Sequence, residues 1–337
     1  MVAQSRSFRR VFDPLALTDR LRRARARRAP LAAGGAVTAY RVADGAGDDL
    51  PGMAIDRLGE AAVLALEAGH GVGDRDVTAL AGIVLRELGP DGVAAVYVKH
   101  LMRDRSRLGG CAPDEARSAV PRAGRPLPET LVVREYDARY EVRPYDGLST
   151  GLFLEHREHR RALAGRPPGR ALNLFAYTCA FSVPLAAARW QVTNVDVSGR
   201  ALEWGRRNLA LNGLPPEAVR FLRRDARAFL ASAARGAERF DLVILDPPTF
   251  GAADRRRGIP AWRAAHDYPA LLQAAAMVLA PGGAIFAATN TRELASGDVL
   301  ARLVADALGG RPRRLPLPPW PLDVTAPGRV AAVLVSP

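Results

Sequence analysis

The sequence predicts an α/β protein in which a doubly wound parallel sheet follows a smaller α+β domain. Two observations carry this prediction. After residue 151, short apolar segments typical of buried strands alternate with amphipathic segments typical of helices, which favours parallel strands with right-handed crossovers. Between about residues 37 and 143, one helical pattern lies among several strand-like segments. We expect a basic helix or arm at 1–30, a small domain at 31–145 and a larger domain at 146–337.

The first part of the chain opens with a basic stretch, because residues 6–28 hold nine arginines and two aspartates. Thr18 is expected to cap a helix with an apolar side made of Leu17, Leu21 and Ala24. The arginines between 22 and 28 would then form a basic surface, either solvated or in contact with an acidic partner. In the small domain we expect strands near 37–42, 61–66, 93–98 and 131–142, a helix near 74–88 and a loop at 103–128.

The larger domain is predicted to alternate regularly between strands and helices. Because ligands on doubly wound sheets bind at the carboxyl ends of the strands, the residues that follow each strand are the candidates for function. The expected strands are 171–175, 191–196, 219–222, 241–245 and 284–288; the expected helices are 181–188, 199–211, 226–234, 262–279 and 297–308; and two extended segments lie near 313–317 and 329–335.

Composition bounds the class of protein. With 48% hydrophobic and 25% charged residues, the 337-residue chain can bury a core, which excludes a disordered or fibrous protein. Two cysteines without a metal-binding pattern, and no apolar run of about 18 residues, lead us to expect a cytoplasmic protein without a membrane span. The net charge of +13 favours nucleic acid as a partner. Coding bias explains why Lys99 is the only lysine, but not the excess of bases over acids.

Polar residues follow three of the predicted strands at positions typical of an adenosine site. The loop after the first strand, residues 175–181, contains no glycine, which argues against a dinucleotide. Asp196 follows the second strand and could accept from ribose hydroxyls, and Asp225 follows the third and could accept from an adenine amino group. The alternative is that both aspartates only cap the helices after them. An adenosine site without a phosphate-binding loop fits S-adenosylmethionine better than NAD or ATP.

The segment after the fourth strand is the most specific feature of the sequence. It reads Asp246-Pro247-Pro248-Thr249-Phe250, and two prolines there cannot continue a strand. They would fix a rigid turn whose carboxylate and carbonyl groups suit the N–H groups of a nucleobase edge, while Phe250 stacks on its face. A base presented in this way is unpaired or flipped out of its helix.

Four segments together resemble a known family: TGLFLEHR at 150–157, LNLFAYTCAFS at 172–182, VDVSGRALEWGRRNLALNGL at 195–214 and FDLVILDPPTF at 240–250. They are similar to the large-subunit ribosomal RNA methyltransferases, which are class I, Rossmann-like, S-adenosylmethionine-dependent enzymes. One branch methylates guanine N7 and a sibling branch cytosine C5. The resemblance extends to residues 50–57 and is strongest from 151 to 290. It implies a donor site formed by Phe153, Arg157, Phe175, Tyr177, Thr178, Asp196, Asp225 and Asp246, the last bridging donor and base.

The chemistry of the two branches separates them. Cytosine C5 methylation requires a thiolate that adds to C6, and in that branch the cysteine follows the fifth strand. Asn290 occupies that place here, while Cys179 lies in the donor loop and Cys111 in the small domain. Guanine N7 has an in-plane lone pair and loses no proton, so alignment by Asp246, Phe250 and Asn290 suffices. The histidines 156, 159 and 266 are then unneeded as bases, and each is expected at the surface or in a turn.

The sequence therefore predicts an rRNA-processing enzyme that methylates guanine N7, with an RNA-recruiting small domain. Four alternatives stay open: methylation of cytosine C5, methylation of an exocyclic amine, a small-molecule methyltransferase, and a non-catalytic RNA-binding relative. The last arises because residues 177–181 read YTCAF where the family has YTGGF or YTGS. Residues 255–257, three arginines after the Asp-Pro-Pro segment, are candidates for phosphate contacts. The oligomeric state is not predicted.

Overall fold

A computed structural model describes residues 13–67, 74–101, 114–295, 298–309, 312–325 and 330–337. The chain forms two compact units. The N-terminal unit consists of Met1–Arg157 and Trp320–Ala326, and the C-terminal unit of Glu158–Pro319 and Pro327–Pro337. We expected a boundary at 145/146; the division into units falls at 157/158, where Arg157 forms an ion pair with Asp323 inside the N-terminal unit.

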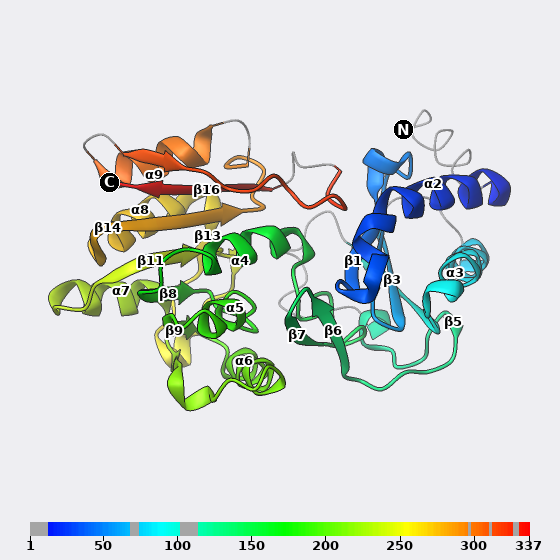
Figure 1. Ribbon diagram of the computed structural model, residues 1–337, viewed down its shortest axis with the longest axis horizontal. Helices are drawn as coiled ribbons and strands as arrows, with labels where there is room; N and C mark the ends of the chain where they lie inside the picture. The colour runs from blue at the N-terminus through cyan, green and yellow to red at the C-terminus, as the bar shows by residue number, and fades with distance from the viewer. Residues whose placement is uncertain (1–12, 68–73, 102–113, 296–297, 310–311, 326–329) are drawn as a thin grey trace. The chain divides into compact units, whose positions relative to one another are not determined.

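The C-terminal unit is built on a seven-stranded sheet in the order β10-β9-β8-β11-β14-β16-β15 (Figure 1). Its first five strands are parallel, as predicted. The order reverses between β8 and β11, so their carboxyl ends form the switch point at which such sheets bind ligands. The strands are β8 (Arg170–Leu174), β9 (Gln191–Asp196), β10 (Arg220–Arg223), β11 (Phe240–Leu245), β14 (Leu279–Thr289), β15 (Arg313–Leu315) and β16 (Ala331–Ser336).

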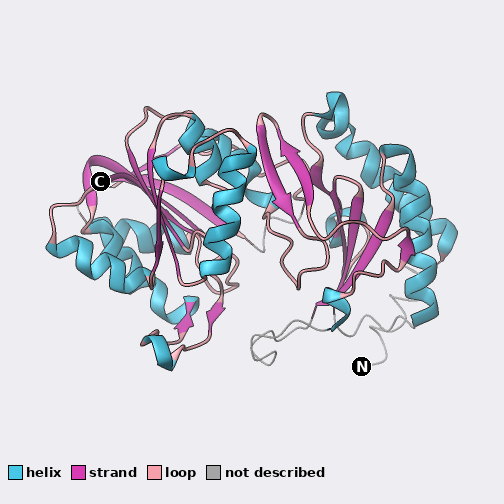
Figure 2. Ribbon diagram, turned by 90° about the horizontal axis from the view of Figure 1, so that it is seen from below, coloured by secondary structure: helices cyan, strands magenta, loops and turns pink. Residues whose placement is uncertain are grey.

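Two features of this unit differ from the prediction. The strand β16 runs antiparallel between β14 and β15, which completes the sheet with one reversed strand. The helix expected at 262–279 is shorter, because Trp262–Arg263 is a strand, β13, that pairs with β12 (Phe250–Gly251) to form a hairpin. The helices, which Figure 2 shows on both faces of the sheet, are α4 (Arg157–Ala164), α5 (Ser182–Ala187), α6 (Gly199–Leu211), α7 (Ala226–Arg235), α8 (Ala264–Ala276) and α9 (Val299–Leu308).

The N-terminal unit contains a five-stranded sheet in the order β1-β2-β3-β4-β5. The helix α3 connects the parallel strands β3 and β4, and the segment expected as one strand at 131–142 is a hairpin that turns at Tyr136, with a φ of 56°. The strand β2 was not predicted. The elements are α2 (Pro14–Ala32), β1 (Ala39–Asp44), β2 (Met53–Leu58), β3 (Ala61–Glu67), α3 (Asp74–Leu88), β4 (Ala95–Leu101), β5 (Ala123–Gly124), β6 (Leu131–Glu135) and β7 (Ala138–Val142).

The helix α2 has the apolar side that the sequence predicts, with Leu17, Leu21 and Ala24 buried in the core of the unit. Asp13, rather than Thr18, caps it by accepting from the Leu15 N–H at 3.0 Å. Its basic surface is largely neutralised, because the arginines between 22 and 28 all form ion pairs. The pairs are Arg22–Glu87, Arg23–Asp19, Arg25–Asp91, Arg27–Asp48 and Arg28–Asp48.

Residues 320–326 return from the C-terminal part of the sequence into the N-terminal unit. Asp323 is fully buried there, where it pairs with Arg157 and accepts from the Arg41 N–H at 2.8 Å. The Thr325 N–H donates to Asp44 at 2.8 Å. A Cβ on Gly47 would lie only 2.1 Å from the Thr325 hydroxyl, so glycine is required for this close approach. The returning segment is therefore an integral part of the unit.

Candidate functional site

The loop after β8 adopts an unusual backbone although it contains no glycine. Phe175, Tyr177 and Cys179 have φ angles of 55°, 48° and 57°, in the left-handed region that side chains disfavour by about 1–2 kcal/mol each. The Cys179 N–H donates to the Ala176 carbonyl at 2.7 Å, and the Ala176 N–H donates to Val195 of β9 at 3.2 Å. The loop is thus bound to the neighbouring strand at the switch point of the sheet.

Cys179 packs against the helix α6. Its side chain is fully buried, and a Cβ placed on Gly205 would lie 2.4 Å from its sulfur. Asn208 of the same helix donates to the Thr178 carbonyl at 2.9 Å. Burial raises the pKa of the Cys179 thiol well above its ordinary value, so the thiol stays protonated. Glycine at 205 therefore provides the space that cysteine takes at 179.

Asp196 lies at the end of β9 and binds the loop directly. One carboxylate oxygen accepts from the Tyr177 N–H at 2.9 Å and the other from the Ser198 N–H at 2.8 Å. Burial raises the pKa of this carboxyl group. A carboxylate has about four acceptor positions, and these two bonds use two of them. Asp196 can therefore hold the loop and still accept from the hydroxyls of a ribose.

Asp225, at the end of β10, caps α7 as the alternative interpretation anticipated. It accepts from the N–H groups of Arg227 and Ala228 at 3.0 and 3.1 Å, and pairs with the Arg227 side chain at 3.0 Å. Arg227 also donates to the Pro260 and Ala261 carbonyls at 2.9 and 3.2 Å. Asp225 thus fixes the hairpin of β12 and β13 through Arg227. Because it accepts four hydrogen bonds in total, an adenine contact would have to share or replace one of them.

The Asp-Pro-Pro segment after β11 is fixed by aromatic residues that the sequence analysis did not select. Trp262 donates from its indole nitrogen to the Pro248 carbonyl at 2.7 Å. The buried Tyr268 hydroxyl lies 2.8 Å from the Ala288 carbonyl and 3.1 Å from that of Leu245, so it connects the ends of β14 and β11. The sequence analysis missed both residues because it assigned them to a single helix at 262–279, whereas Trp262 lies in β13 and Tyr268 in α8.

Asn290, after β14, meets the same segment. The Thr249 hydroxyl donates to the Asn290 amide oxygen at 2.7 Å, which leaves the amide nitrogen as a donor. Phe250 is 52% exposed, and Pro247 is buried while Pro248 is exposed. Acceptors at Asp246, a donor at Asn290 and an exposed ring at Phe250 therefore lie at the ends of two neighbouring strands.

Two other candidates, Phe153 and Arg157, belong to the N-terminal unit. Phe153 is 43% exposed, and the buried Arg157 guanidinium forms an ion pair with Asp323. Cys111 lies outside the described residues.

The three histidines lie in different environments. His266 is exposed. His156 and His159, expected at the surface or in a turn, are buried; His156 lies in the short 3-10 turn Leu154–His156, and burial lowers the pKa of His159 in α4 to about 4.

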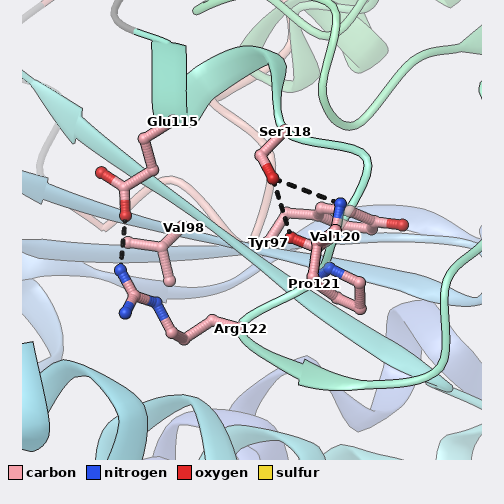
Figure 3. A pocket seen from close by; sticks show the side chains of 7 residues that line it. All are labelled: Tyr97, Val98, Glu115, Ser118, Val120, Pro121 and Arg122. Carbon is pink, nitrogen blue, oxygen red and sulfur yellow. Dashed lines mark hydrogen bonds and ion pairs between the residues drawn. The ribbon is translucent and has the colours of Figure 1, made fainter.

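A cavity of about 260 Å³ lies in the N-terminal unit (Figure 3). Its charged groups are partnered: Glu115 pairs with Arg122 at 2.9 Å and with His100. None of the strand-end candidates borders it. The cavity is lined by Tyr97, Val98, Glu115, Ser118, Val120, Pro121 and Arg122.

Two further searches cover only the described part of the chain. They find no helix long and apolar enough to cross a membrane, and no group of metal-ligating residues.

Comparison with known proteins identifies the family. Residues 88–331 match the S-adenosylmethionine-dependent methyltransferase family. A candidate methyltransferase, SMU.776, complexed with SAH has a TM-score of 0.81 at 21% identity, over 96% of this chain and 81% of that chain. A SAM-dependent methyltransferase from Agrobacterium tumefaciens has 0.61 at 23%, over 89% and 90%. A tRNA m1G methyltransferase from M. jannaschii has 0.57 at 13%, over 94% and 78%.

The residues at the strand ends fit the methyl donor. Asp196 retains acceptor positions for the ribose, and the thiol of Cys179 packs against α6 instead of occupying a donor site. S-adenosylmethionine supplies an electrophilic methyl group on a positively charged sulfur. The aromatic rings of Phe175 and Tyr177 lie on the loop that would enclose it. The match covers more than half of the sequence, and the chain belongs to the S-adenosylmethionine-dependent methyltransferases.

Proposed function

We propose that this enzyme methylates a nucleobase in RNA, at guanine N7 of ribosomal RNA, and acts in the cytoplasm. The observation that carries the proposal is the arrangement of Asp246, Phe250 and Asn290 at the ends of β11 and β14, beside the switch point. A carboxylate accepts from guanine N1–H or the exocyclic amine, an amide donates to a base edge, and an exposed ring stacks on its face.

Methylation at guanine N7 requires only that the base nitrogen and the donor methyl group be aligned. The nitrogen attacks the methyl carbon with its in-plane lone pair, the carbon–sulfur bond breaks, and the sulfur takes the bonding pair. No proton leaves the base in this step, so the enzyme contributes alignment and exclusion of water. The rigid turn that Trp262 and the Thr249–Asn290 bond hold in place is suited to that task.

The cytosine C5 alternative lacks a nucleophile among the described residues. Cys179 is the one cysteine among them, and it is buried, protonated and packed against Gly205. A thiol in that state cannot add to a pyrimidine. Asn290 occupies the position after β14 where that chemistry would need a cysteine.

Methylation at guanine N1 is the second candidate, because one structural neighbour is a tRNA m1G methyltransferase. In that reaction a carboxylate must accept the N1 proton, and we assign this role to Asp246. The two candidates use the same base and the same residues, and they differ in which edge of guanine faces the donor.

The test is methyl transfer from radiolabelled S-adenosylmethionine to unmodified ribosomal RNA, with digestion to nucleosides and chromatography. Label in 7-methylguanosine supports the proposal, and label in 1-methylguanosine supports the second candidate. Label in 5-methylcytidine contradicts both. Asp246→Asn is the control that shows whether the label depends on this enzyme, because the substitution removes the charge with almost no change in side-chain volume. Donor binding without label in any RNA would redirect the search to small molecules.

A further inference from the structure

The positive charge of the protein is concentrated in one unit. The N-terminal unit contains 24 basic and 22 acidic residues, a net charge of +2, whereas the C-terminal unit contains 24 and 13, a net charge of +11. Nearly all of the excess therefore belongs to the unit that carries the methyltransferase sheet. This distribution favours the C-terminal unit, rather than the small domain and its basic helix, as the main electrostatic contact for RNA.

Five exposed arginines lie together at one edge of the C-terminal unit. None of them forms an ion pair within the described residues, in contrast to the arginines between 22 and 28 of α2. One ends β10, one follows it, and three lie in the hairpin between β12 and β13. We call these residues the arginine rim: Arg223, Arg224, Arg255, Arg256 and Arg257.

A shared acceptor brings the two parts of the rim together. The Val197 carbonyl, just after β9, accepts from Arg257 at 2.7 Å and from Arg223 at 3.4 Å. Since β9 and β10 are neighbouring parallel strands, the residues after them lie at the carboxyl edge of the sheet. The rim therefore borders the strand ends that hold Asp196 and Asp225.

The backbone of the hairpin tip is fixed. Asp254 and Ile259 form two reciprocal N–H···O bonds of 2.9 Å, Asp254 also accepts from the Arg257 N–H, and Gly258 closes the turn with a φ of 66°. The base of the hairpin is held by Arg227, whose guanidinium lies 5.7 Å from the Trp262 ring centroid and binds the Pro260 and Ala261 carbonyls. Three arginines are thus presented on a rigid arm.

The same hairpin carries Phe250, the proposed stacking residue, in β12. Phe250 pairs with Arg263 across the hairpin, and residues 255–257 form its tip. A contact between the tip and RNA phosphates would therefore set the position of the target base relative to the sugar–phosphate backbone. Guanidinium groups bind phosphates through paired hydrogen bonds and remain charged at every physiological pH.

We infer that the arginine rim binds the phosphates that flank the target base of an RNA strand, so that the C-terminal unit supplies the main electrostatic contact with the substrate. The inference rests on the proposed function for the identity of the polymer. The inference goes beyond the proposed function, because it names the contact surface and assigns only a minor electrostatic role to the N-terminal unit.

The test measures the salt dependence of binding to a fluorescent, unstructured RNA oligonucleotide. Three proteins are compared: the wild type, the rim variant R255Q/R256Q/R257Q, and the control variant R189Q/R235Q/R313Q. The control removes the same charge from exposed arginines of the same unit at the amino ends of its strands. Each phosphate contact contributes about 0.7 to the slope of log K against log salt for single strands, so the rim variant should lose about 2.

The control variant is expected to keep nearly the wild-type slope. Equal slope changes in both variants, or no change in the rim variant, would overturn the inference, because net charge and not position would then govern binding. Donor binding measured by calorimetry shows that each variant is folded. If the slopes behave as expected but no RNA becomes methylated, the inference stands and the proposed function fails. If RNA is methylated and the rim slope is unchanged, the proposed function stands alone.

Discussion

The contact between Cys179 and Gly205 gives a prediction that can be calculated from the structure. In Gly205→Ala, the new Cβ would lie 2.4 Å from the Cys179 sulfur and 2.9 Å from its Cβ, closer than carbon atoms approach in proteins. Overpacking of this kind costs about 3 kcal/mol at the upper end of its range. Alanine in the interior of α6 recovers about 1 kcal/mol of helix propensity. We expect a net destabilisation of about 2 kcal/mol.

The sign should reverse when Cys179 is first replaced by glycine. Both close contacts then disappear, and the next nearest atom in the present structure belongs to the Phe221 ring at 3.4 Å, an ordinary contact distance. Gly205→Ala should now stabilise the protein by about 1 kcal/mol through helix propensity. The coupling between the two positions is then about 3 kcal/mol, in the range found for residues in direct contact.

The assay is equilibrium unfolding in urea of the four proteins of the double-mutant cycle, followed by the fluorescence of Trp204 and its neighbours. Calorimetry of S-adenosylmethionine binding reports whether the loop that carries Tyr177 has moved. Gly82→Ala in α3 is the matched control, since nothing lies within 4 Å of its Cβ. Equal effects of Gly205→Ala in both backgrounds, within about 0.5 kcal/mol, would refute the packing argument.

Four other predictions concern the site and its support. Asn290→Ala should lower the rate of methyl transfer about tenfold with donor binding retained, because one hydrogen bond to the base is lost; an unchanged rate in single-turnover assays would contradict this. Phe250→Ala should weaken RNA binding by about 1–3 kcal/mol, and Phe250→Trp should restore it. Asp323→Ala removes the carboxylate that pairs with the buried Arg157 and should destabilise the N-terminal unit by about 3–5 kcal/mol in urea unfolding; an unchanged free energy of unfolding would contradict this. Because burial lowers the pKa of His159 to about 4 from 6.5, the unfolded chain binds its proton first as pH falls, so stability is present above pH 6.5 and decreases by about 3 kcal/mol toward pH 4; His159→Leu should show a smaller decrease.

The sequence was informative wherever function follows from the position of a strand end. The alternation of strands and helices placed Asp196, Asp246 and Asn290 at the carboxyl edge of the sheet, and the structure brings them to strands β9, β11 and β14. It could not separate the two interpretations of Asp225. Capping a helix and binding an amine both require an acceptor at the same position, and only the contact with Arg227 shows which is satisfied.

Partners that are distant in the sequence account for the remaining differences. Arg157 lies in a motif of the donor site, but its counter-ion Asp323 is 166 residues away. The arginines of α2 are a basic run in the sequence, and Glu87 and Asp91, which neutralise two of them, come from the far end of α3 and the turn after it. The sequence shows where charged residues occur along the chain, whereas the structure shows which of them form ion pairs.

The return of residues 320–326 to the N-terminal unit has a consequence for how the protein is made. During synthesis, the first 157 residues leave the ribosome long before Asp323, so Arg157 lacks its pair with Asp323 and Asp44 lacks Thr325. The sheet of the C-terminal unit is also incomplete until β16 has been made, since β16 pairs with β14 on one side and β15 on the other. Domains usually fold one after another as they emerge, but here the N-terminal unit is complete only after residues 320–325 have been translated and the C-terminal unit only after β16. We therefore expect both units to complete their folding late and close together in time.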